Sequence, residues 1–171
     1  MPKISAGILL YRKVATGYEV LLVHPGGPFW AKKDNGSWSI PKGEVTEGEE
    51  LELAAKREFA EEVGSAAPEG VYTTLSPVKY GNKIVHAFAL ESDFDLKNFK
   101  SNTFELEWPP KSGNKQQAPE NDKAAWVSLG KAKQKLVKGQ VSLIEQLFDM
   151  LSVGDDDDTT ELADSPQTTL F

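Results

Sequence analysis

One segment limits the possible folds more than any other: residues 49–63, which are predicted to form a helix. The segment opens with acidic residues, is rich in Leu, Ala, Glu and Lys, and stops at Gly64, a residue type that often ends helices. Three apolar residues share one face of its first half: Leu51, Ala54 and Ala55. On a neighbouring face we expect Phe59 and Val63 to belong to the core.

Short apolar runs before and after this helix predict a sheet. Gly, Pro and Asn turns separate the runs, and Gly81 with Asn82 predicts a hairpin. We expect strands at residues 4–11, 19–23, 38–40, 71–80, 83–90, 103–108 and 124–129. We expect closing helices at residues 131–137 and 141–151, and a long polar loop at 109–123. Strands on both sides of a central helix indicate an α/β or α+β sandwich.

Length and composition favour a single domain in a cytoplasmic protein. The 171 residues include no cysteine, which excludes disulfides and thiolate metal sites. No apolar run approaches the length of a membrane-spanning helix, and the first residues lack the pattern of a signal peptide. We therefore expect a folded domain over residues 1–153 and an acidic, disordered tail over 154–171, with no membrane partner.

The net charge of −7 is concentrated in that tail. Six of the 26 acidic residues and none of the 19 basic residues lie in 154–171, which leaves 20 acids against 19 bases in the rest of the chain. A nearly neutral body with an acidic tail gives no reason to expect duplex nucleic acid as a partner, because phosphate backbones need a basic surface. Any phosphate chemistry must rest on a local arrangement.

The second half of the central helix brings three carboxylates together. Glu58, Glu61 and Glu62 fall within an arc of about 100° on its surface. Like charges three and four residues apart repel each other, so something must offset the repulsion. Three convergent oxygen ligands suit a hard divalent cation such as Mg²⁺ or Mn²⁺. The alternative is a solvated acidic face without a ligand.

The spacing of residues around these carboxylates resembles a known family motif. Gly43 is followed after five residues by Glu49, and after seven more by R-E-F-A-E-E-V-G at residues 57–64. This resembles the Nudix box, G-x5-E-x7-R-E-U-x-E-E-x-G-U with U apolar, at every position but the last, where Ser65 stands. The resemblance implies the α/β/α sandwich of the Nudix fold, with a mixed sheet and a loop–helix–loop that carries the box, over about residues 3–151.

The same resemblance implies a Mg²⁺ site, with Mn²⁺ as a possible substitute, and a role for each residue of the box. The implied metal ligands are the backbone carbonyl of Gly43 and the carboxylates of Glu58, Glu61 and Glu62. Glu49 is expected to support the cluster through water or through Arg57. Arg57 lies four residues before Glu61 and is expected to hold the carboxylates in place by a salt bridge. The general base that activates water is Glu62 or Glu61 in this scheme, or an acid from a distant loop, for which Glu120 is the candidate.

Lys42 and Tyr80 are the residues expected to bind substrate, with Glu120 nearby. Lysine in the P-K-G sequence before the box resembles Nudix enzymes that act on dinucleoside polyphosphates or diphosphoinositol polyphosphates, and Lys32 and Lys33 are further candidates. Tyr80 follows the box by a spacing similar to that of a tyrosine in dinucleoside polyphosphate members, where it could stack on a base. The alternative for Tyr80 is packing at the end of a hairpin.

The chain ends in Q-T-T-L-F, from Gln167 to Phe171. This ending resembles the Q-x-x-L-F peptides by which bacterial proteins bind the replication sliding clamp, so we list a clamp contact through these residues as a hypothesis beside that of a tail without a partner.

The function expected from these observations is Mg²⁺-dependent hydrolysis of a pyrophosphate bond in a nucleoside diphosphate linked to another moiety. A dinucleoside polyphosphate is the leading substrate. The first alternative is a house-cleaning pyrophosphatase of (deoxy)nucleoside triphosphates. The second is a Nudix-fold module that binds a nucleotide without turnover.

Overall fold

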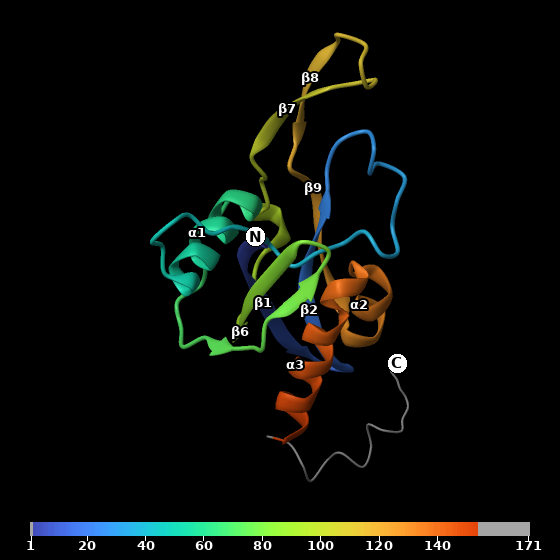
Figure 1. Ribbon diagram of the computed structural model, residues 1–171. Coiled ribbons are helices and arrows are strands. Elements are labelled where there is room, and N and C mark those ends of the chain that lie inside the picture. Colours follow the sequence, from blue (N-terminus) through green and yellow to red (C-terminus); the bar gives the residue numbers. More distant parts are fainter. Residues whose placement is uncertain (1, 154–171) are drawn as a thin grey trace.

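The computed structural model describes residues 2–153 (Figure 1). The expected acidic tail, and the ending at Gln167–Phe171 for which a clamp contact is a hypothesis, lie outside the described residues. In the described part of the chain, no helix is long and apolar enough to cross a membrane.

A mixed seven-stranded sheet forms the centre of the fold. Its strands are β1 (Lys3–Val14), β2 (Gly17–Pro25), β3 (Lys42–Glu44), β4 (Thr73–Thr74), β5 (Val78–Tyr80), β6 (Lys83–Glu91) and β9 (Asn121–Ser128). The main path is β4-β6-β1-β2-β9, while β3 pairs with β1 and β5 pairs with β6. β1 and β6 are parallel, whereas β1–β2, β1–β3 and β2–β9 are antiparallel. β1 is thus the central strand, with partners along both edges.

Helices cover both faces of this sheet and make the expected α/β/α sandwich (Figure 1). The helices are α1 (Leu51–Val63), α2 (Leu129–Lys135) and α3 (Val141–Val153), with short 3-10 turns η1 (Leu96–Asn98) and η2 (Lys138–Gln140). Along β1, Ile8 and Leu10 belong to the cluster that includes Phe59 of α1, while Leu9 belongs to the cluster that includes Leu143 of α3. Alternate residues of a strand point to opposite faces, so one strand serves both cores.

Several predicted elements differ in their limits. Residues 38–40 do not form a strand, although Trp38 and Ser39 make isolated bridges, and the strand in this region is β3, which begins after Pro41. The strand expected at 71–80 is divided into β4 and β5 around Ser76 and Pro77, because proline has no N–H to donate to a ladder. The predicted helix 49–63 begins two residues later, at Leu51.

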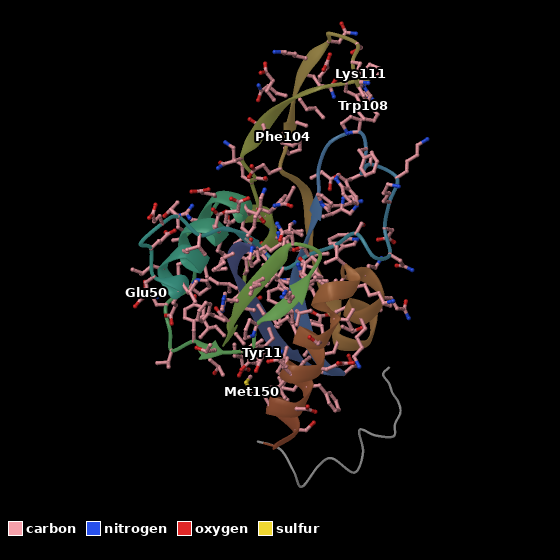
Figure 2. All side chains as sticks on the ribbon, viewed as in Figure 1. Tyr11, Glu50, Phe104, Trp108, Lys111 and Met150 are labelled. Carbon is pink, nitrogen blue, oxygen red and sulfur yellow. The ribbon has the colours of Figure 1, made fainter. Side chains whose placement is uncertain are left out.

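The predicted polar loop 109–123 contains a strand, β8, that the sequence did not predict. β7 (Thr103–Glu107) pairs with β8 (Lys115–Pro119) in a separate two-stranded hairpin that projects from the body, with Phe104 nearest its base and Lys111 at its tip (Figures 1 and 2). The sequence K-Q-Q-A-P of β8 lacks the β-branched and aromatic residues that mark strands, so only its pairing with β7 makes it one.

Candidate active site

A cleft of about 310 Å³ lies where β3 runs between the start of β1 and helix α1. Acidic and basic side chains both line it. The lining residues are Lys3, Ser5, Lys42, Gly43, Glu44, Glu58, Glu61, Glu62, Lys83 and Glu120. Every residue that the sequence analysis assigned to the metal therefore lines one cleft, together with Lys42 and Glu120.

Helix α1 places the three carboxylates by its pitch and by its burial. Ala54, Ala55, Phe59 and Val63 are fully buried against the sheet, as expected for Phe59 and Val63 from the helical period. This packing fixes the rotation of the helix, so Glu58, Glu61 and Glu62 face the cleft. The side chain of Glu58 is 13% exposed and that of Glu61 is 43% exposed, so the carboxylates range from enclosed to open.

Arg57 forms ion pairs with several carboxylates of the acidic cluster. Its Nε and Nη2 donate to the Glu49 carboxylate at 2.8 and 2.9 Å. Its Nη1 donates to Glu58 Oε2 at 2.7 Å and to Glu61 Oε2 at 3.2 Å. Nη2 also donates to the carbonyl oxygen of Glu44, at the end of β3, at 3.1 Å. One guanidinium thus offsets the repulsion among the carboxylates and ties the helix to β3.

These contacts separate the charge states of the acids. Hydrogen bonds from Arg57 and from the backbone N–H of Thr46 lower the pKa of Glu49 to about 2. Burial raises the pKa of Glu58, although Arg57 opposes this change. Burial also raises the pKa of Glu62 to about 7, while the Asn121 amide and Lys42 favour its charged form. Glu62 is therefore the acid whose charge costs most in this arrangement.

Glu62 is held differently from its two neighbours. In the described part of the chain, Glu58 and Glu61 bond to Arg57, whereas Glu62 Oε1 accepts a hydrogen bond from the backbone N–H of Lys42 at 3.2 Å. The three carboxylates consequently do not converge on one point, and within residues 2–153 no group of three or more acidic or histidine side chains is arranged as a finished ligand set.

The chemistry around Gly43 nevertheless fits a hard divalent cation. A Cβ at Gly43 would collide with the Glu58 carboxylate, so any larger residue here would displace that group from its present position. The donors available here are carboxylate and carbonyl oxygens, the ligands that Mg²⁺ and Mn²⁺ prefer. The residues that could hold such an ion are those of the sequence prediction: Gly43, Glu58, Glu61 and Glu62.

Two lysines of the cleft were missed by the sequence analysis. Lys3 and Lys83 begin the parallel strands β1 and β6 and are partners in register. Lys3 Nζ lies 3.6 Å from Glu44 Oε2, and both side chains are largely exposed. With Lys42 they bring the number of lysines that line the cleft to three. Only the pairing of two strands 80 residues apart brings them together, and no local sequence signal carries that information.

Of the residues expected to bind substrate, Tyr80 is not brought to the cleft. Its hydroxyl accepts a hydrogen bond from Gln140 Nε2 at 3.0 Å, and its ring lies against Gly139. Tyr80 packs on the core cluster shared with α2 and α3, whereas the carboxylates lie on α1. Glu120, by contrast, does line the cleft, at the base of the β7–β8 hairpin. Lys32 and Lys33 lie in the exposed loop after β2 and are not among the lining residues of the cleft.

Comparisons with known proteins agree with this architecture. The model of the NUDIX domain matches residues 1–147. An RNA pyrophosphohydrolase of Caulobacter vibrioides is 44% identical over 66 residues, which is 36% of this chain and only 38% of that protein. An Ap4A hydrolase of Caenorhabditis elegans, solved as a binary complex, has a TM-score of 0.57 at 24% identity over 88% of this chain and 98% of its own. The NUDIX domain of Shewanella oneidensis NrtR, solved with ADP-ribose, has a TM-score of 0.60 at 19% identity over 88% and 89%.

Proposed function

The chain belongs to the NUDIX domain family, and from this membership we propose that it is a pyrophosphohydrolase that cleaves a P–O–P bond in a nucleotide. The observation that carries the proposal is the cleft itself. Glu58, Glu61 and Glu62 line it together with Lys3, Lys42 and Lys83. Acids that gather a cation and ammonium groups that gather phosphate oxygens are together what a pyrophosphate bridge requires.

The residues of the cleft have separate roles in the proposed reaction. Gly43, Glu58, Glu61 and Glu62 would hold Mg²⁺ or Mn²⁺, and Arg57 with Glu49 keeps the carboxylates in place. When bound, the cation supplies charge neutralisation of the pyrophosphate and activation of water. Water attacks phosphorus, the bridging P–O bond breaks, and the proton of the water passes to a carboxylate.

We assign to Glu62 the role of the general base that accepts this proton. It is half-buried, it accepts a hydrogen bond from the backbone N–H of Lys42, and in the described structure it is free of the Arg57 ion pairs that occupy Glu58 and Glu61. Glu120 is the alternative, because it lines the same cleft from the junction between β8 and β9. Replacement of the true base by glutamine lowers kcat by about 10²–10⁴-fold, so Glu62→Gln and Glu120→Gln, measured side by side, decide between them.

A dinucleoside polyphosphate is the proposed substrate. Three lysines in one cleft exceed what a single pyrophosphate needs, which favours a longer phosphate chain. The fold shared with the C. elegans Ap4A hydrolase supports this choice. A second candidate is the 5′-triphosphate end of RNA, because the Caulobacter relative that shares 44% identity over 66 residues is an RNA pyrophosphohydrolase.

A substrate panel tests the proposal. The protein is incubated with a dinucleoside tetraphosphate, a 5′-triphosphorylated RNA, nucleoside triphosphates and ADP-ribose, with Mg²⁺ and then with EDTA, in ¹⁸O water. Products identified by mass spectrometry show which bond breaks and which phosphorus gains ¹⁸O. Cleavage of only nucleoside triphosphates would establish the house-cleaning alternative. Binding without any turnover would establish a nucleotide-binding module.

Binding to the replication sliding clamp through Gln167–Phe171 is a separate proposal. It rests on the Q-x-x-L-F ending alone. A pull-down with the clamp, repeated with Leu170→Ala and Phe171→Ala, tests it, and absence of binding by the unmodified protein would end the idea.

A further inference from the structure

His24 is a fully buried ionisable residue for which the proposed reaction has no use. It lies near the end of β2, it has no exposed surface, and it is not among the residues that line the cleft. Its ring packs edge-to-face on the ring of Trp38, with 5.1 Å between the ring centroids. Burial of a group that can carry charge is costly unless its polar atoms are paired, so the partners of this ring are informative.

Both ring nitrogens of His24 face hydrogen-bond acceptors. Nδ1 lies 2.8 Å from Asp122 Oδ1, on β9. Nε2 lies 2.6 Å from the backbone carbonyl oxygen of Lys33, in the loop between β2 and β3. A carbonyl oxygen and an ionised carboxylate can only accept, so both contacts are hydrogen bonds only when both nitrogens carry a proton. The geometry therefore fits the imidazolium form of His24, because the neutral ring has a single N–H.

Charged groups of β9, of the loop and of α2 surround this ring. Lys123 of β9 is the register partner of His24, and its ammonium lies 5.9 Å from the centroid of the indole against which His24 packs. Lys135 of α2 lies at the same distance from that centroid and pairs with Asp34 of the loop at 2.8 Å. In the described structure, the Asp122 carboxylate is thus the charged group that bonds to the imidazole.

The bond to the Lys33 carbonyl ties the middle of the loop to β2. Within the described residues, every other backbone hydrogen bond of residues 27–33 is local. Before this stretch, the N–H of Gly26 donates at 2.9 Å to the carbonyl of Glu120, a residue that lines the cleft. After it, the N–H of Gly36 donates at 3.0 Å to a carbonyl of α2. The imidazole is therefore the hydrogen-bonding partner that holds residues 27–33 between these two fixed ends.

This loop carries exposed aromatic and basic groups beside the cleft. Phe29 is 57% exposed, its ring packs edge-to-face on that of Trp30, and Lys33 Nζ lies 4.9 Å from the centroid of the Phe29 ring. The loop extends from the same end of the sheet as the β7–β8 hairpin, whose base is next to Glu120 (Figure 1). Any change at the Lys33 carbonyl is thus a change in a loop that adjoins the cleft.

We propose that His24 is a proton-dependent latch for residues 27–33: as an imidazolium it binds Asp122 and the Lys33 carbonyl together, and on loss of one proton it releases the carbonyl. The proton that stays lies between Nδ1 and Asp122, because a hydrogen bond to an ionised carboxylate is stronger than one to a neutral carbonyl. Nε2 then presents a lone pair to the carbonyl oxygen, and the two atoms repel each other. The loop is thus held at lower pH and released at higher pH, and imidazole is the side-chain group that can make this change in the neutral range.

Nitrogen NMR of the imidazole rings tests the protonation state. His24 and His86 are the two histidines of the chain, so a His86→Gln variant assigns the signals of His24. At about pH 6 both ring nitrogens of His24 should carry a proton, and on titration to about pH 9 Nε2 should lose its proton while Nδ1 keeps it. A ring that stays neutral, or stays charged, over this whole range would overturn the proposal. The test requires no turnover, so it is independent of the proposed function.

Backbone amide exchange measures the latch itself. The N–H groups of Trp30 and Lys33 are hydrogen-bonded within the loop, so their exchange reports its opening. After correction for the intrinsic rise of exchange with pH, their protection should fall about fivefold to tenfold as His24 loses its proton, which is the effect of about one hydrogen bond. The amides of α3 should keep their protection. A loop whose protection does not change with the charge of His24 would contradict the latch.

Two variants of His24 separate the proton from the contact. His24→Gln places a neutral amide N–H near the position of the ring Nε2, so the protection of the loop should no longer depend on pH. His24→Leu removes both polar contacts, and the protection should be low at every pH. If His24→Leu does not fold, His24→Gln alone carries the test. A loss of protection with rising pH that persists in His24→Gln would show that another group responds, and it would refute the role of His24.

Asp122→Asn tests the partner that retains the proton. A neighbouring negative charge favours the imidazolium, so its removal should move the loss of protection to lower pH. Asp149→Asn, at an exposed acid of α3, is the matched control and should leave the transition in place. A transition that is the same in Asp122→Asn as in the unmodified protein would contradict the assignment of this carboxylate.

Discussion

Two polar clusters hold the segment at residues 39–44, and they are built in opposite ways. The Arg57 cluster comprises Arg57, Glu49, Glu58 and Glu61, is charged and partly exposed, and grips the carbonyl of Glu44. The Gln140 cluster comprises Gln140, Ser39 and Tyr80, is neutral, and bonds the Ile40 N–H. Gln140 is fully buried, whereas the side chain of Arg57 is 34% exposed.

This difference in exposure and charge indicates that the two clusters have separate roles, one in catalysis and one in stability. Water can replace lost bonds in an exposed charged cluster, so its members affect stability little but set the charge of the cleft. A buried neutral cluster leaves unpaired groups when a member is lost, so it affects stability strongly. Lys42 and Gly43 lie between these two supports. We therefore expect variants of the Arg57 cluster to alter turnover and variants of the Gln140 cluster to alter folding.

Among variants of the two clusters, Arg57→Ala should give the largest effect, a fall in kcat of about 100-fold. The substitution leaves Glu58 and Glu61 without their shared cation, and their mutual repulsion displaces both carboxylates. The free energy of unfolding should fall by only about 1 kcal/mol, because the lost pairs are partly solvated. Steady-state kinetics and thermal melts measure the two effects.

Lys56→Ala is the control for Arg57→Ala. Lys56 lies next to Arg57 on the same helix and pairs with Glu52 at 3.4 Å, away from the lining residues of the cleft. It should leave kcat unchanged. An Arg57→Ala enzyme with normal kcat, or with a large loss of stability instead, would contradict the proposal that the Arg57 cluster affects turnover more than stability.

Gln140→Leu should destabilise the fold by about 1–3 kcal/mol and leave KM unchanged. Its side chain donates to Ser39 Oγ and to the Tyr80 hydroxyl, both at 3.0 Å, and accepts from the Ile40 N–H at 3.0 Å. Leucine satisfies none of these groups, and the Ile40 N–H has no access to water. Urea unfolding measures the cost, and kcat of the folded protein should remain within a few-fold of normal.

Gln146→Leu provides a matched comparison. Gln146 lies on α3 and also uses both ends of its amide, on the N–H and the carbonyl of Ser76, but in exposed bonds that water can replace. Its loss should cost less than about 1 kcal/mol. If the two substitutions lowered the free energy of unfolding equally, burial would not be the reason that the Gln140 cluster affects stability.

Sequence reasoning succeeded where the structure is local. The positions of Glu58, Glu61 and Glu62 follow from helical pitch, and the core positions of Phe59 and Val63 follow from the same period. The contacts of Arg57 with Glu49, Glu58 and Glu61 were also accessible, because all four residues lie on α1 or just before it.

Sequence reasoning failed where distant segments meet. Lys3 and Lys83 join the carboxylates in the cleft only through strand pairing, which no local pattern specifies. Tyr80 was placed by its distance from the box in sequence, but its surroundings depend on the division of 71–80 into two strands and on the packing of Gly139 and Gln140 against it.

Tyr80→Phe gives a smaller effect that tests this correction. Removal of the hydroxyl takes one acceptor from Gln140 Nε2 and should cost about 0.5–1.5 kcal/mol of unfolding free energy. KM for every nucleotide of the panel should stay the same, because Tyr80 is not among the residues that line the cleft and its hydroxyl bonds to Gln140. A clear rise in KM would instead restore Tyr80 as a substrate-binding residue.

The smallest expected effect is a difference in the response of the two clusters to acid. Arg57 and the Thr46 N–H lower the pKa of Glu49 from its ordinary value of 4.5 to about 2 in the folded protein. A carboxylate whose pKa is lowered by folding stabilises the fold fully above its unfolded pKa, and this contribution is lost as the pH falls toward the folded value. Glu49→Gln should therefore melt slightly below the unmodified protein at pH 7, and the gap should close between about pH 4.5 and pH 2.

Gln140→Leu should behave differently in the same series of melts. The Gln140 cluster holds no carboxylate or imidazole, so its destabilisation should persist unchanged across that pH range. A Glu49→Gln gap that stays constant with pH would mean that its ion pair with Arg57 does not contribute to stability. A Gln140→Leu gap that closes with the other would mean that the neutral cluster depends on the charged one, since the two share only the segment at residues 39–44.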